Sequence, residues 1–301
     1  MVFTGIFILM IFFFCWLYYI SKADKGFATY SKGINTEVVS SYDLTNGIYD
    51  KELIHMVEYA NLCDIVYRRP DKSQVTKFNG WQKSLMSTDK YLASNSNKNI
   101  TNLYFEIWEF VKESDDIIIA IVLRGTEFTS LSDWKANLRW FIKGIDKNSW
   151  DHYNELGKIN LNLVNDIKEH YSSFGNNLRI ISTGHSLGGG LAQYMAYSIP
   201  DINLVYAFDA SPVTGYYDVK PRSRRVENKR DAVIYRIYES GEGLSFARKF
   251  MTILYPAPLF KIKNPALIRI RFSFRTGISS IDQHSISELA KSLISAKEKF
   301  M

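Results

Sequence analysis

The sequence predicts an α/β fold in which helices flank a mostly parallel central sheet. Apolar runs of strand length recur along the chain, near 103–110, 117–124, 178–183, 204–208, 232–238 and 267–274. Helix-like stretches lie between several of these runs, and strands that alternate with helices build parallel sheets. The chain has 301 residues, of which 46% are hydrophobic, so one domain with a sizeable core is expected.

The N-terminal segment is predicted to be a transmembrane anchor at residues 1–20. Residues 2–20 carry no charge and, at ~1.5 Å per residue, extend about 28 Å as a helix, enough to cross a hydrocarbon core. The rings that favour a membrane interface end this run: Trp16, Tyr18 and Tyr19. A cleaved signal stays open because Ser21 and Ala23 form a small-x-small site. We expect a single-pass membrane protein whose domain lies on either side of the membrane. If residues 1–23 are cleaved, we expect a secreted protein instead.

Between this anchor and the predicted α/β domain lies a predicted tether, residues 21–49, which is polar and contains Gly, Ser and Asn. The domain is expected over residues 50–301 and begins with a helix at 51–67. Only Cys63 lies outside the apolar run, so an intradomain disulfide is excluded. The sequence has neither a Cys/His cluster with metal spacing nor a Gly-rich phosphate loop, so no metal or cofactor is expected.

The most informative motif is a G-x-S-x-G pentapeptide at Gly184-His185-Ser186-Leu187-Gly188. An apolar strand-like run precedes it and a helix-like run follows it, which is the context of a nucleophile elbow. Glycines on both sides permit the tight turn that lifts the Ser186 hydroxyl above the sheet. The start of the helix then favours the negative charge that develops during acyl transfer.

Three further features accompany this elbow. Arg124-Gly125-Thr126 ends an apolar run and can supply oxyanion donors. Two acidic side chains, Glu239 and Glu242, follow the strand-like run 232–238, and His284 precedes a C-terminal helix. The order Ser, acid, His along the chain is that of α/β-hydrolase triads.

Together these residues resemble the class 3 lipases, the fungal-lipase-like branch of the α/β-hydrolases, over roughly residues 50–300. The family elbow G-H-S-L-G-G matches Gly184–Gly189, and its R-G-[ST] and D-W-x-x-[DN] motifs match Arg124–Thr126 and Asp133–Asn137. The resemblance implies that Glu242 falls on the acid of the family's N-x-x-D-x-[VI]-P stretch. Here Glu replaces Asp and the Pro is lost, and the nearby Glu239 keeps the assignment open.

The expected mechanism gives each residue a role. Ser186 is the nucleophile, His284 the general base and Glu242 the acid that orients His284. The Leu187 amide and Thr126 are expected to bind the oxyanion. A second histidine, His185, lies within the elbow and is a rival base, although its place before the serine favours a packing role.

The net charge of +6 is unevenly spread. Seven basic residues lie within 220–236: Lys220, Arg222, Arg224, Arg225, Lys229, Arg230 and Arg236. Without aromatic interleaving or a recognition helix, nucleic-acid binding is not expected. The span is interpreted either as a patch for anionic lipid headgroups or as a solvated loop. Residues 127–150, apolar-rich and placed where the family carries a lid, are either a lid or a packed helix.

These observations predict a membrane-anchored serine carboxylester hydrolase that acts on a lipid ester, acylglycerol or phospholipid, through an acyl-enzyme. The expected partners are this lipid-like ester and the bilayer. Two alternatives stay open. One is a soluble-ester or acyl-transfer enzyme with the same triad, and the other is a degenerate hydrolase that serves as a membrane-bound binding module.

Overall fold

The computed structural model describes residues 50–67, 75–86, 88, 91, 103–112, 116–125, 152–211, 214–239, 242, 244, 266–272, 274 and 282–300. The predicted anchor (1–20), the predicted tether (21–49) and the lid-like stretch (127–150) lie outside these residues. Within the described part of the chain, none of the helices is both long and apolar enough to span a membrane.

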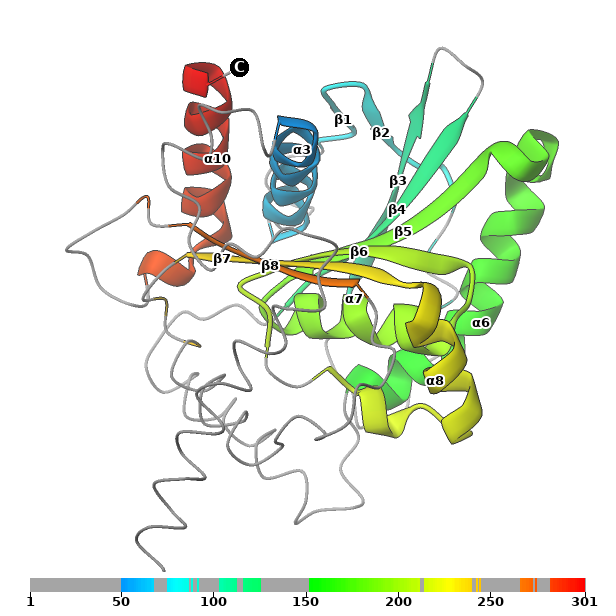
Figure 1. The fold of residues 1–301 in the computed structure, drawn as a ribbon. Helices are drawn as coiled ribbons and strands as arrows, with labels where there is room; N and C mark the ends of the chain where they lie inside the picture. The colour runs from blue at the N-terminus through cyan, green and yellow to red at the C-terminus, as the bar shows by residue number, and fades with distance from the viewer. Residues whose placement is uncertain are drawn as a thin grey trace, which may run out of the picture.

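The centre of the fold is an eight-stranded sheet whose strands lie in sequence order (Figure 1). Its strands are β1 (Lys77–Phe78), β2 (Trp81–Lys83), β3 (Phe105–Val111), β4 (Ile117–Leu123), β5 (Leu178–His185), β6 (Ile202–Phe208), β7 (Val233–Glu239) and β8 (Ala266–Phe272). Strands β4 to β8 run parallel, whereas β1 to β4 pair antiparallel. The antiparallel half was not predicted; β3 and β4 are joined by a connection too short for a parallel crossover.

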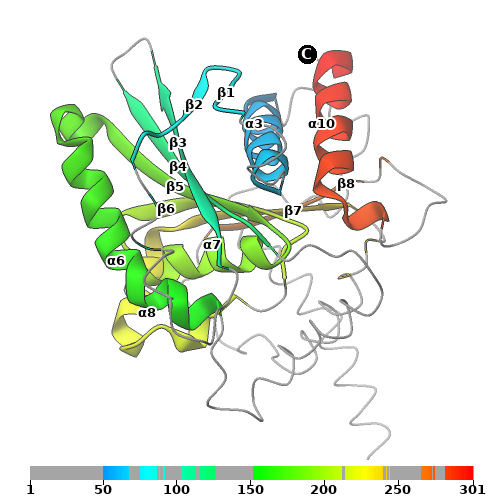
Figure 2. The same cartoon turned by 180° about the vertical axis from the view of Figure 1, so that it is seen from behind.

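Within the described residues, five α-helices cover the sheet, and their bounds are α3 (Asp50–Tyr67), α6 (His152–His170), α7 (Leu187–Ser198), α8 (Arg222–Asp231) and α10 (Ile286–Phe300). Helices α3 and α10 lie side by side on one face, and α6, α7 and α8 lie on the other (Figure 1, Figure 2). The molecule is therefore a three-layer α/β/α arrangement in which helices connect the successive parallel strands β5, β6 and β7.

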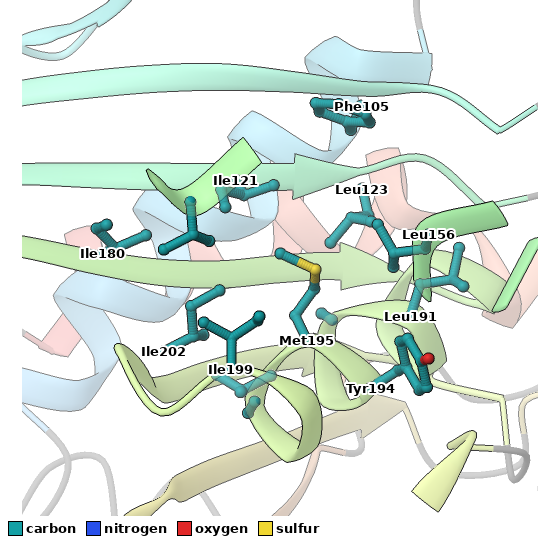
Figure 3. Packing of buried hydrophobic residues seen from close by; sticks show 14 of the residues in the cluster. Phe105, Ile121, Leu123, Leu156, Ile180, Leu191, Tyr194, Met195, Ile199 and Ile202 are labelled. Atoms are coloured by element: carbon teal, nitrogen blue, oxygen red, sulfur yellow. The ribbon is translucent and has the colours of Figure 1, made fainter. Parts of the chain in front are cut away.

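Strand β4 shows why the sheet is buried on both faces. All seven of its side chains are buried. Ile119, Ile121 and Leu123 join the apolar cluster under α6 and α7, whereas Ala120 and Val122 join the cluster under α3 and α10. Figure 3 shows the first cluster, where residues of β4, β5, α6 and α7 meet. A continuous apolar run, rather than an alternating one, is what a strand covered on both sides requires.

The predicted helices and strands fall close to the observed ones, with two differences. The hairpin of β1 and β2 was not predicted because its strands have only two and three residues. Residues 222–231, considered as part of a solvated loop, form helix α8. This helix has little apolar character, and its one buried residue is Arg225, whose Nη1 donates to the Val219 carbonyl at 2.9 Å.

Candidate functional site

Ser186 sits in a strained turn between β5 and α7. Its backbone angles are φ 57° and ψ −121°, a region that costs a non-glycine residue on the order of 1–3 kcal/mol. Two glycines make the turn possible, because a side chain at Gly184 would collide with Gly188 and one at Gly188 with the Leu123 carbonyl. The strand, the sharp turn and the helix thus meet the geometry that the pentapeptide predicts.

Neighbouring strands hold this turn in place. The Ser186 amide donates to the Phe208 carbonyl, and the Ser211 amide donates to the Ser186 carbonyl, both at 2.9 Å. The Ser186 side chain is only 1% exposed, and its Oγ makes no hydrogen bond within the described residues. The backbone of Ser186 is therefore fixed by hydrogen bonds to the C-terminal end of β6 and the residues that follow it, while its hydroxyl has no structural role within the described residues.

Glu242 and His284 form a buried pair. The Oε2 atom of Glu242 lies 2.7 Å from His284 Nδ1, and the two side chains are 0% and 4% exposed. The Leu244 amide donates to the same Oε2 atom at 2.8 Å, which fixes the carboxylate in the loop after β7. His284 lies in the short turn Asp282–His284 before α10. The fold therefore brings together an acid and a histidine that are 42 residues apart in the sequence.

His185 braces this pair from the elbow. Its Nε2 lies 2.9 Å from the His284 carbonyl oxygen and, since a carbonyl only accepts, Nε2 carries the hydrogen. Its Nδ1 lies 3.0 Å from the hydroxyl of Tyr67, at the end of α3. Burial, followed by the charge of His284, lowers the pKa of His185 well below 6.5. His185 is therefore neutral near pH 7, with both ring nitrogens engaged.

Asp209, which no sequence motif singles out, lies close to His185 and His284. It follows β6 directly, is fully buried and has φ 40°. One carboxylate oxygen and a ring nitrogen from each of His185 and His284 lie within 4.8 Å of one another. The only signal in the sequence is a polar residue directly after a buried strand. These three donors do not suit a metal, because His185 already uses both nitrogens.

The other acidic candidate, Glu239, is buried at the end of β7. Its amide donates to Asp209 Oδ1 at 3.1 Å, and its carbonyl accepts from the Glu242 amide at 3.4 Å. Glu239 therefore connects Asp209 and Glu242 through its backbone, whereas the 2.7 Å contact with His284 Nδ1 comes from Glu242.

The predicted oxyanion donors are described only in part. Leu187 is the first residue of α7, where a backbone N–H has no partner within the helix. Gly125 lies beside it, since a Cβ on Gly125 would come 3.1 Å from the Leu187 nitrogen and would also collide with the His185 carbonyl. The end of β4 thus approaches the elbow closely enough to require glycine. The second donor, Thr126, lies outside the described residues.

The basic span 220–236 is divided between surface and interior. Arg236 on β7 donates to Gln193 Oε1 at 2.8 Å, and Arg225 is held by the Val219 carbonyl. Lys229 lies over the Tyr216 ring, and burial lowers its pKa. The exposed members are Lys220, Arg222, Arg224 and Arg230. Of the seven basic residues, only these four are exposed to solvent.

The Phospholipase-like family model, described as a Tle-like phospholipase domain, matches residues 58–211, which include the elbow and Asp209. The match supports lipase and esterase chemistry in general and does not single out the class 3 lipases. No curated protein sequence matches the chain.

Three solved structures are distantly similar. Acyl-protein thioesterase 2 of Zea mays has 9% identity over 51% of this chain and 69% of its own, with a TM-score of 0.31. Esterase PF2001 of Pyrococcus furiosus has 11% identity over 66% and 87%, with a TM-score of 0.34. Acetyl xylan esterase 1 of Thermoanaerobacterium has 10% identity over 82% and 94%, with a TM-score of 0.31. Similarity this low adds nothing to the assignment.

Proposed function

The chain is an ester hydrolase with an α/β-hydrolase fold that belongs to the family of Tle-like phospholipase domains, and from that premise we propose that it cleaves phospholipid carboxylesters with a serine nucleophile. The observation that carries this proposal is the strained Ser186 turn beside a buried Glu242–His284 pair. A strained serine at the start of a helix and a histidine oriented by a carboxylate are the parts that acyl transfer needs.

The proposed reaction has two halves. His284 takes the proton of the Ser186 hydroxyl as the oxygen attacks the ester carbonyl, and then delivers that proton to the leaving alkoxide. Glu242 holds the imidazole in one tautomer and stabilises its positive charge. The Leu187 amide and Thr126 bind the tetrahedral oxyanion, and one such donor typically contributes about 3–4 kcal/mol. Water then hydrolyses the acyl-enzyme with His284 as the base.

A phospholipid is favoured over an acylglycerol by the family match. The exposed Lys220, Arg222, Arg224 and Arg230 support the same choice, because each basic residue near an anionic surface contributes about 1 kcal/mol of attraction. We propose that these four residues face the lipid headgroups.

The test uses the full chain in detergent with a fluorophosphonate probe and three substrates: phospholipid vesicles, triacylglycerol emulsion and a short soluble ester. We expect labelling at Ser186 and faster hydrolysis of the phospholipid than of the acylglycerol, with a rate jump when the lipid aggregates. Absence of both labelling and turnover would identify a degenerate hydrolase acting as a binding module. Hydrolysis of the soluble ester alone, without a rate jump, would identify a soluble-ester enzyme.

We also propose that residues 1–20 anchor the protein in a membrane, since the segment has no charged side chain, is mostly apolar and is long enough to cross it. The full chain should stay in the membrane fraction after a carbonate wash, and deletion of residues 1–20 should release it. A mature N-terminus at Asp24 would instead show that the segment is a cleaved signal.

The acid can be assigned with two matched variants. Glu242→Gln should lower kcat about 10⁴-fold, because the neutral amide no longer stabilises the His284 cation and can impose the wrong tautomer. Glu239→Gln should lower kcat less than about 10-fold, since the carboxylate that contacts His284 Nδ1 is that of Glu242. Thermal unfolding of both proteins checks the fold. The reverse ranking would transfer the role to Glu239.

A further inference from the structure

Asp209 is held rigidly next to the proposed triad. Its amide donates to the Ile237 carbonyl at 2.8 Å, and its Oδ1 accepts the Glu239 amide at 3.1 Å. Both bonds come from β7, the neighbouring strand. The left-handed φ of 40° is one that Asp tolerates better than most residues, because its short side chain bonds locally. The carboxylate is therefore fixed where β6 ends, close to the Ser186 turn.

The described titratable groups that approach His284 come from several elements. Glu242 contacts its ring from the loop after β7, and Asp209 approaches from the end of β6 within 4.8 Å. His185, from the end of β5, is neutral because burial and His284 lower its pKa. Tyr67 of α3 contacts His185, and Asp282 in the same short turn as His284 is exposed. Among the described residues, Asp209 is thus a buried carboxylate, besides Glu242, that lies near a ring nitrogen of His284.

We propose that Asp209 is a second acid of the site, which together with Glu242 stabilises the positive charge of His284 during acyl transfer. This inference rests on the proposed function. The proton moves only between Ser186 Oγ, His284 and the leaving alkoxide, and Asp209 neither gains nor loses one. A carboxylate this close favours the protonated imidazole, and an opposite charge within about 4–6 Å typically changes a titration midpoint by about 1–3 pH units. Asp209 is therefore a positioning and electrostatic residue rather than a nucleophile or base.

The test is the pH profile of kcat/KM on a short soluble ester, measured with the full chain in detergent. In Asp209→Asn the acid limb should move about one pH unit lower, because the imidazole loses an attractive charge and gives up its proton more readily. Turnover at neutral pH should fall about tenfold, since a less basic imidazole is a weaker general base. Asn keeps an oxygen acceptor for the Glu239 amide and tolerates the left-handed backbone.

The control is Asp201→Asn at the opposite end of β6, where Asp201 pairs with Lys168 on the surface at 2.7 Å. Its acid limb should not move. Asp209→Gly, which also accepts the left-handed φ, provides a second variant and should give the same shift. Folded Asp209 variants with an unmoved acid limb would overturn this inference alone. Retained hydrolysis in Ser186→Ala would instead overturn the proposed function.

Discussion

Replacement of Ser186 by alanine should abolish ester hydrolysis and leave the fold intact. Without the hydroxyl no acyl-enzyme can form, so we expect kcat on a short soluble ester to fall about 10⁶-fold. The fold should survive because Ser186 is held through its backbone, by Phe208 and Ser211, whereas its Oγ makes no hydrogen bond within the described residues. The free energy of unfolding should change by less than about 0.5 kcal/mol, measured by denaturant titration.

A buried serine on β5, the strand that leads into the Ser186 turn, provides the matched control. Ser182 Oγ donates to the Ala192 carbonyl at 2.9 Å, so its hydroxyl has a structural role. Ser182→Ala should therefore cost about 1 kcal/mol of stability and keep the activity. If Ser186→Ala kept its turnover, the nucleophile would have to be another residue.

An element of the fold was predictable from the sequence where its segment carries a clear pattern of apolar residues. The parallel strands were predictable because two-sided burial demands continuous apolar runs such as Ile117–Leu123. The hairpin of β1 and β2 has too few residues for a periodic pattern, and Arg222–Asp231 has no apolar stripe. Such segments take their conformation from their neighbours, so the sequence alone does not reveal them.

The candidate site likewise has one part that the sequence predicts and another that only the tertiary structure reveals. The Ser186 turn is encoded within five residues, since its glycines and its strained backbone belong to one motif. Glu239 and Glu242 lie three residues apart, so only the contact made with His284 separates them. Asp209 and Tyr67 reach the site through tertiary arrangement, and Tyr67 meets His185 across 118 residues. No pattern along the chain reports such a contact.

Replacement of His284 by alanine should lower kcat about as much as loss of Ser186, because members of a triad act as a unit. For the same reason the double variant Ser186→Ala/His284→Ala should be no slower than either single one. Imidazole added to the buffer should restore part of the turnover of His284→Ala, since it can occupy the space left beside Glu242 and serve as the base. It should not restore Ser186→Ala, which lacks the nucleophile.

Replacement of His185 distinguishes a supporting role from a catalytic one. His185 donates to the His284 carbonyl and meets the Tyr67 hydroxyl, so His185→Ala removes a brace from the backbone of His284. We expect a loss of about 1–3 kcal/mol of stability for the unsatisfied buried groups, and a fall in kcat of only about 10- to 100-fold. Denaturant titration and kcat, measured on the same preparations, test this ranking. If His185→Ala were the crippling change and His284→Ala stayed active, His185 would be the base and the buried Glu242–His284 pair would have only a structural role.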